Sequence, residues 1–275
     1  MVGRIAKRIY LYIIFLFLYA PIVVLVVYSF NESKSRGHWG GFTLKWYREL
    51  LRDREIAAAL YNTLMIAILS SIIATIIGTA AAIGIHNMKK IKKAVVMNLT
   101  YLPVLNPEIV TGVSLMMLFI FMKTFTNIGL GFFTMLLAHI TFNIPYVILS
   151  VLPKLKQLNK HTYEAALDLG ATPLNAIRKV IIPEIMPGIV TGFILAFTLS
   201  IDDFVISFFT TGSGVSNLSI YVYSMARRGI NPKINALSTI MFITILVLLL
   251  IVNKRVSKDN TNNVVASNNV KEVIQ

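Results

Sequence analysis

The chain of 275 residues contains no cysteine, so it can form no disulfide, no thiolate metal site and no cysteine nucleophile. Its four histidines are scattered along the sequence, without the close spacing that a metal site needs. It also lacks the phosphate loop G-x-x-x-x-G-K-S/T and therefore cannot hydrolyse ATP by that route on its own. We expect no enzymatic site in this chain, and no metal or cofactor of its own.

Charged residues are scarce as well, making up 14% of the chain against 56% for hydrophobic residues. With a mean hydropathy of +0.73, the composition is far from that of a soluble globular domain. Only 12 residues are acidic while 26 are basic, which gives a formal net charge of +14. The basic residues lie in short segments between apolar runs, so we expect a membrane protein and no nucleic-acid partner.

Six apolar runs are long enough to cross a bilayer as helices. They cover residues 9–30, 57–85, 95–122, 130–152, 188–210 and 235–252. The second is rich in small residues, which favours close helix packing inside a bundle. The fourth carries His139 and Asn143, which we expect to form interhelical hydrogen bonds. The sequence therefore predicts an all-α, polytopic membrane protein with six transmembrane helices.

The distribution of lysine and arginine predicts the orientation of these helices. Basic residues are more frequent on the N-terminal side of the first run and on every second connection after it. The positive-inside rule places that side in the cytoplasm, together with both termini of a multi-pass cell-membrane protein. Residues 1–8 are then a cytoplasmic N-terminus and residues 9–252 a single transmembrane domain with a cytoplasmic loop at 154–187. Residues 253–275 form an Asn-rich cytoplasmic tail that we expect to be disordered.

The cytoplasmic loop contains the most informative stretch, EAALDLGATPLNAIRKVIIPEIMPG. Its chemistry predicts two short helices that meet at a fixed corner. Asn159 is suited to cap the first helix, and Gly170 to end it in a left-handed conformation. Thr172 can cap the second helix with Pro173 in its first turn, and Pro183 is expected to end it.

The spacing of this stretch resembles the EAA loop of ABC importer permeases, written EAA-x3-G-x9-I-x-L-P. The sequence follows this pattern through Glu164, Ala165, Ala166, Gly170 and Pro183, with conservative replacements at the Ile and Leu positions. The resemblance implies a coupling helix that docks in a groove of a separate ATPase subunit, which binds ATP and Mg. The alternative is an ordinary cytoplasmic hairpin with no partner.

Three carboxylates interrupt the apolar runs: Glu108, which directly follows Pro107, and the adjacent Asp202 and Asp203. A charged residue at the bilayer centre costs about 2.5–3.5 kcal/mol, so such residues usually serve a function. Glu108 and Asp202 lie at a similar depth, about 22 Å from the cytoplasmic boundary. We interpret the three as a layer of negative charge that attracts a cation, in a pathway lined by the proline-interrupted third run.

Other interpretations of these carboxylates are open at this point. Glu108 could cap the helix that begins beside it. Adjacent helical residues point about 100° apart, so at most one of Asp202 and Asp203 can face a pore squarely. One of them could instead pair with Arg227 or Arg228 in the following loop.

Four further segments resemble the PotC-type permeases of spermidine/putrescine importers. They are PVLNPEIVTGVSL (103–115), AHITFNIPYVI (138–148), SIDDFVISFFTTG (200–212) and SIYVYSMARRGINPKINALST (219–239). The resemblance implies a MetI-like ABC permease fold. It also implies a complex with a second homologous permease, two copies of an ATPase and an extracytoplasmic polyamine-binding protein, in which this chain forms half of the pathway.

Two other functions fit parts of the sequence. Related permeases for other small solutes share much of this framework, so the substrate could differ. A self-sufficient secondary cation transporter would use the carboxylates as a relay and support flux without partners, but it leaves the stretch from Glu164 to Gly170 unexplained. A membrane-embedded enzyme or scaffold is disfavoured because catalytic motifs are missing.

Overall fold

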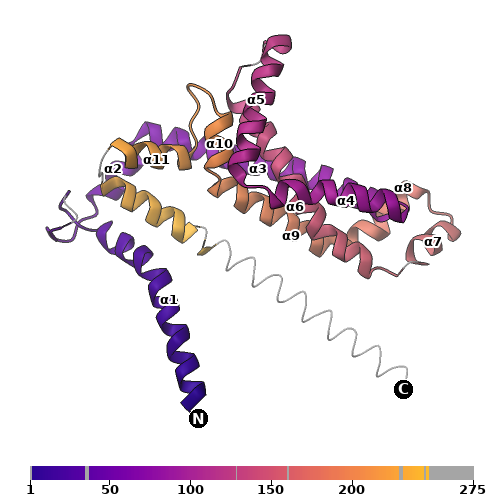
Figure 1. Ribbon diagram of the computed structural model, residues 1–275, viewed down its shortest axis with the longest axis horizontal. Helices are drawn as coiled ribbons and strands as arrows, with labels where there is room; N and C mark the ends of the chain where they lie inside the picture. Colours follow the sequence, from indigo (N-terminus) through magenta and orange to yellow (C-terminus); the bar gives the residue numbers. More distant parts are fainter. Residues whose placement is uncertain are drawn as a thin grey trace. The chain divides into compact units, whose positions relative to one another are not determined.

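The computed structural model describes residues 2–34, 37–127, 129–159, 161–228, 232–244 and 246–247. Most of these residues are helical (Figure 1), and the β pairing found among them is an isolated antiparallel bridge between Asn31 and Phe42. This confirms the predicted all-α class. The chain divides into two compact units, one from Met1–Ala57 with the described part of Tyr221–Gln275, the other Ala58–Ile220.

The unit Ala58–Ile220 contains most of the long helices. Its elements are α3 (Arg54–His86), which begins just before the unit, α4 (Lys90–Leu105), α5 (Glu108–Thr126), α6 (Phe132–Gln157), α7 (His161–Asp168), α8 (Pro173–Ala176), the π-helical turn η1 (Ile177–Ile181), α9 (Ile182–Asp202) and α10 (Val205–Thr210). The central helix is α6, because residues along its length from Thr134 to Leu155 are buried and it packs most extensively along α9.

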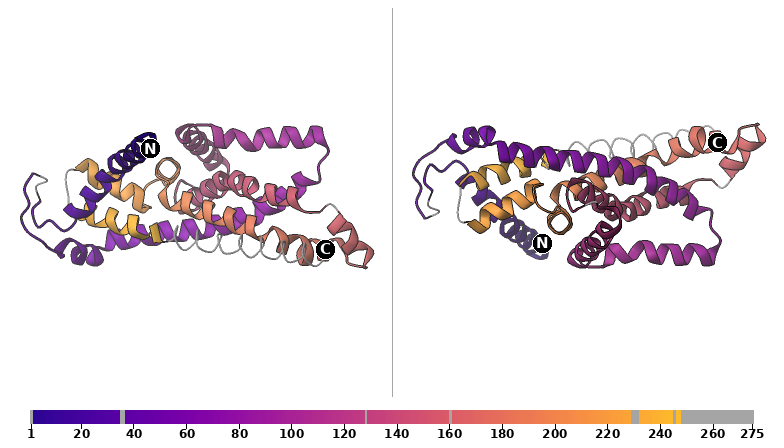
Figure 2. Two further views of the ribbon diagram at one scale, coloured as in Figure 1. Left: turned by 90° about the horizontal axis from the view of Figure 1, so that it is seen from below. Right: turned by 90° about the horizontal axis from the view of Figure 1, so that it is seen from above.

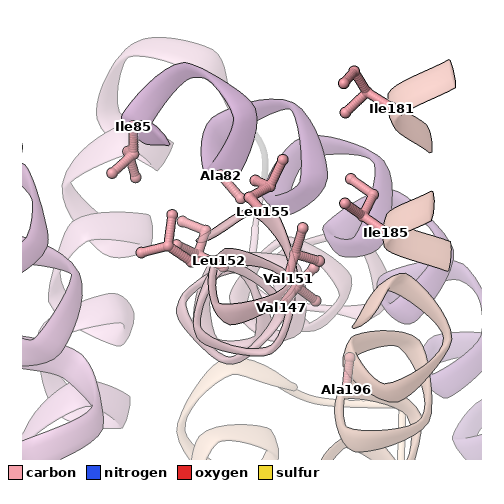
Figure 3. Packing of buried hydrophobic residues seen from close by; sticks show 10 residues of the cluster. Ala82, Ile85, Val147, Val151, Leu152, Leu155, Ile181, Ile185 and Ala196 are labelled. Atoms are coloured by element: carbon pink, nitrogen blue, oxygen red, sulfur yellow. The ribbon is translucent and has the colours of Figure 1, made fainter. Parts of the chain in front are cut away.

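The apolar core of this unit lies where α6 meets α3 on one side and η1 and α9 on the other (Figure 3). Its buried residues are Ala82, Ile85, Val147, Ile148, Val151, Leu152, Leu155, Ile181, Ile185 and Ala196. Two glycines permit the close approach of the helices. A Cβ on Gly78 would lie 2.7 Å from Val147 Cβ, and one on Gly192 would lie 3.2 Å from Val147 Cα. Tight packing of the second run through its small residues is therefore confirmed.

The third apolar run forms two helices instead of one interrupted span. α4 ends at Leu105 and α5 begins at Glu108, and the two helices leave this corner in different directions (Figure 2). Asn106 has extended backbone with φ −74° and ψ 143°, because the ring of Pro107 disfavours the helical conformation in the preceding residue. Pro103 is accommodated inside α4. The break is thus caused by Pro107.

Five described helical stretches are long and apolar enough to span a membrane: Lys7–Tyr28, Arg54–His86, Glu108–Thr126, Phe132–Gln157 and Pro173–Asp202. They overlap five of the six predicted runs. The sixth run, 235–252, extends beyond the described residues, which are helical over 232–244. The predicted cytoplasmic tail, 253–275, also lies outside them.

The other unit contains α1 (Val2–Tyr28), α2 (Lys45–Arg52), the greater part of α11 (Leu218–Arg228) and the helical residues 232–244. Buried Trp46 joins α2 to the preceding loop, since its indole N–H donates to the Asn31 carbonyl at 2.8 Å. Lys233 Nζ lies 3.6 Å from Glu49 Oε2 and 3.5 Å from Asp53 Oδ2. The Trp46 bond holds the loop that follows α1 against α2, and the Lys233 contacts hold α2 to the helical residues 232–244.

Candidate coupling loop and membrane carboxylates

The first helix of the cytoplasmic loop, α7, begins and ends as the sequence predicted. Asn159 Oδ1 accepts a hydrogen bond from the His161 N–H at 3.1 Å, which caps the N-terminus. Gly170 has φ +85° and lies two residues beyond the end of the helix. The Ala171 N–H then donates to the Ala166 carbonyl at 3.1 Å, the bond that closes a left-handed helix stop. Both end signals are confirmed.

The second helix also starts as predicted, but its end was predicted wrongly. Thr172 Oγ1 accepts from the Asn175 N–H at 3.4 Å, and Pro173 occupies the first turn. The helix does not stop at Pro183, since α8, η1 and α9 follow one another without a break. In η1 the Ile182 N–H donates to the Ile177 carbonyl five residues back. This wider turn precedes the proline and lets the helix pass through it.

The corner between α7 and α8 exposes apolar side chains. Leu169 is 89% exposed and Leu174 is 75% exposed, on either side of Gly170. On α7, Ala165 is exposed and Ala166 is half-buried. Neither leucine was predicted as a functional residue. Their position beside a glycine corner was the available signal.

Glu164 of α7 is exposed, and its Oε2 lies 3.1 Å from Nδ1 of His161, one turn earlier. Behind α7 the structure contains a cavity of about 560 Å³. It is lined by the ends of α3 and α6 and by α7 and η1, with Tyr163, Glu164, Leu155 and Ile181 among its residues. Because this space separates α7 from the ends of α3 and α6, α7 is attached to the bundle mainly through α8 and η1.

The two adjacent aspartates occupy opposite environments. Asp202 is the last residue of α9 and its side chain is exposed, whereas Asp203 is 8% exposed. Asp203 has extended backbone, with φ −62° and ψ 126°, which separates α9 from α10. Its Oδ1 accepts from the Ile206 N–H at 3.1 Å and its Oδ2 from the Ser207 N–H at 2.8 Å. The Asp203 carboxylate therefore caps α10 from inside the bundle.

His139 and Asn143 of α6 form interhelical hydrogen bonds, as predicted. His139 Nε2 lies 2.9 Å from Ser207 Oγ and 3.5 Å from Asp203 Oδ2. Asn143 Nδ2 donates to Ser200 Oγ of α9 at 2.7 Å. These bonds tie α6 to both sides of the break between α9 and α10. The ring that faces the Asp203 carboxylate thus belongs to a histidine of the same unit.

Glu108 lies in the first turn of α5 and is exposed. Its negative charge is favourable at the positive end of the helix dipole. One turn further along α5, a Cβ on Gly112 would lie 3.0 Å from a ring carbon of Phe209 in α10. Of the three carboxylates, Glu108 and Asp202 are therefore open to the surroundings, while Asp203 is turned into the protein.

Comparison with known proteins agrees with this architecture. Residues 74–257 match the family described as binding-protein-dependent transport system inner membrane component. The spermidine/putrescine transport system permease protein PotC of Escherichia coli (strain K12) is 37% identical over 261 residues, covering 95% of this chain and 97% of that protein. The putrescine transport system permease protein PotI of the same strain is 41% identical over 231 residues, covering 82% of each chain.

Solved structures of ABC transporters have the same fold. One chain belongs to an ABC transporter involved in the import of the acidic polysaccharide alginate, with a TM-score of 0.71 and 19% identity over 92% of this chain and 94% of that chain. Another belongs to the MetNI methionine ABC transporter in inward-facing conformations, with a TM-score of 0.60, 17% identity and coverage of 79% and 99%. The chain belongs to the binding-protein-dependent transport system inner membrane components, a family of non-enzymatic permease subunits of transport systems.

Proposed function

We propose that this chain is the membrane-spanning permease subunit of an ATP-driven importer of polyamines, with spermidine and putrescine as substrates. The observation that carries the proposal is its identity of 37% to a spermidine/putrescine permease over 95% of the chain. The exposed Asp202 at the break in α9 supports it, because a polyamine carries ammonium groups that a carboxylate attracts.

In this proposal the chain forms half of the pathway and a second homologous permease forms the other half. Two copies of an ATPase bind ATP and Mg and dock at the loop that contains Glu164, Ala165, Ala166 and Gly170. The exposed Leu169 and Leu174, on either side of the Gly170 corner, supply apolar contact to the ATPase. An extracytoplasmic polyamine-binding protein delivers the substrate. The chain itself holds no cofactor and no metal, and both termini lie in the cytoplasm.

The proposed pathway uses Asp202 and Glu108 as its charged groups. A carboxylate that faces lipid is costly, so an exposed Asp202 within an apolar run is expected to face water or the partner permease. Ammonium groups of the substrate bind transiently to these carboxylates while its methylene stem passes along apolar walls. Binding stays loose because water screens the charges, which permits release. The apolar side chains exposed along α1, such as Phe15, Leu16 and Phe17, face lipid or the second permease.

Reconstitution in liposomes tests the proposal directly. This permease is combined with a candidate ATPase, second permease and binding protein, and uptake of labelled spermidine and putrescine is measured with ATP supplied to the ATPase. We expect uptake that needs every component and stops with a hydrolysis-deficient ATPase. Uptake of a different small solute would show that this chain is the permease of a related importer with another substrate. Flux through the purified chain alone would show a secondary transporter.

A further inference from the structure

The cluster around Asp203 also holds the loop 211–217 against the break between α9 and α10. Asn217 Nδ2 donates to Ser207 Oγ at 2.8 Å and to the Asp203 carbonyl at 3.3 Å. Since Ser207 also bonds to His139, four side chains form one connected network. None of the four is more than 8% exposed. The network therefore joins α6, α10, the helix break and the loop.

The end of the same loop is fastened to α3. The Leu218 N–H donates to Thr63 Oγ1 at 2.8 Å, and Asn62 Nδ2 donates to the Ser216 carbonyl at 3.0 Å. Thr63 Oγ1 in turn donates to the Ala59 carbonyl at 2.8 Å, which leaves its lone pairs directed at the loop. The loop is thus held between α3 and the Asp203 cluster and cannot shift without breaking buried hydrogen bonds.

The Asp203 carboxylate has little capacity left for a substrate. It accepts two backbone N–H bonds, faces an imidazole and lies inside the bundle. Asp202, one residue earlier, makes none of these contacts and is exposed. The extended backbone at Asp203, which the capping bonds stabilise, sets the direction in which α10 leaves the end of α9 at Asp202.

We infer that Asp203 is a positioning residue for transport, and that it acts without binding the polyamine. It fixes the break between α9 and α10, to which Asn217 ties the loop 211–217, and it thereby holds α10 and the loop in place beside Asp202, which meets the cation. This inference rests on the proposed function, in which Asp202 faces the pathway. Loss of the Asp203 carboxylate leaves the buried N–H donors of Ile206 and Ser207 unsatisfied and weakens the break to which Asn217 ties the loop, whereas loss of the Asp202 charge leaves the break intact.

Transport kinetics separate the two roles. Uptake of labelled spermidine by the complete reconstituted importer is measured over a range of concentrations for Asp202→Asn, Asp203→Ala and Asp203→Asn. We expect Asp202→Asn to raise KM at least tenfold with kcat nearly unchanged. Asp203→Ala should lower kcat at least tenfold with KM within twofold, and Asp203→Asn should recover part of kcat because its amide oxygen can still accept one of the two backbone bonds. A rise in KM alone for Asp203→Asn would overturn the inference.

Cysteine labelling provides a second test that does not require transport. The chain has no cysteine, so a single Cys at half-buried Ser216 reports on the loop, and one at exposed Ser213 is the matched control. The bond from Asn62 reaches the Ser216 backbone carbonyl, so Ser216→Cys preserves it. In the detergent-solubilised complex, Asp203→Ala should speed maleimide labelling at position 216 at least tenfold, with no change at 213.

Asp202→Asn should leave labelling at both positions unchanged. Equal labelling at position 216 with and without Asp203→Ala would overturn the inference. The complete importer could also fail to take up spermidine, both unaltered and with each variant, while labelling follows the expected pattern. In that case the proposed substrate is wrong, but the role of Asp203 in holding the break stands.

Discussion

Replacement of Gly170 by valine tests whether the corner between α7 and α8 couples the ATPase to the membrane helices. Gly170 has φ +85°, a conformation in which L side chains clash with their own backbone. A Cβ at this position would meet nothing within 4 Å, so the substitution creates no conflict with neighbouring residues. Its cost is therefore local backbone strain.

The energy of this strain can be estimated, and two further variants serve as controls. A left-handed conformation costs a residue other than glycine about 1–2 kcal/mol, which lowers the population of the native corner about 5–30-fold. Asparagine tolerates this conformation, so Gly170→Asn should retain most of the coupling. Gly84 in α3 is a matched control, because a Cβ there also meets nothing within 4 Å but its backbone is not left-handed. Gly84→Val should be tolerated.

The assay measures labelled spermidine taken up per ATP hydrolysed by the reconstituted complex, together with the amount of inserted permease. For Gly170→Val we expect this ratio to fall at least fivefold while insertion is unchanged. Gly170→Asn and Gly84→Val should stay close to the unaltered permease. Full uptake by Gly170→Val in an assembled complex would refute the reasoning, since the left-handed corner would then be unnecessary for coupling.

Three further predictions concern packing, topology and buried polar contacts. Gly78→Leu should destabilise the permease by about 1–3 kcal/mol, because even a Cβ would lie 2.7 Å from Val147 Cβ; a lowered Tm in detergent checks this. A single Cys at Ile91 should resist an impermeant thiol reagent added outside intact cells, and labelling there would invert the proposed topology. Asn143→Leu removes the hydrogen bond to Ser200 and should lower the free energy of unfolding by about 0.6–1.7 kcal/mol, measured as a fall in Tm. The fall should be smaller when Ser200 is already replaced by alanine, because the bond is then absent before the change.

The coupling loop could be predicted in detail because most of its signals are local. An N-cap, a left-handed glycine and a proline in the first turn each act within about four residues, so Asn159, Gly170 and Thr172 were identified correctly. Pro183 was not, because proline ends a helix only when no alternative hydrogen-bonding pattern is available. The π-helical turn η1 supplies such an alternative, and whether it forms depends on the packing of Ile181 against the core.

The third apolar run illustrates a different limit. Hydropathy identified an apolar segment with two prolines, but the pattern does not distinguish a kink inside one helix from a corner between two. Pro103 remains inside α4, while the helix ends before Pro107, which favours extended backbone at Asn106. The outcome depends on tertiary contacts, in particular those of α5 with α10 around Gly112.

The adjacent aspartates show why charge in an apolar run is informative but incomplete. The cost of burying charge marked Asp202 and Asp203 as unusual, and helical geometry predicted that both could not face the same way, although Asp203 lies outside the helix and the different directions come from the break. It could not indicate that the helix would break between them, because the caps on α10 come from Asp203 itself and the imidazole comes from His139 on another helix. A buried carboxylate with such partners stabilises a bend, while its exposed neighbour is free to meet a cation. The two residues share one chemistry and are predicted to differ in their kinetic effects.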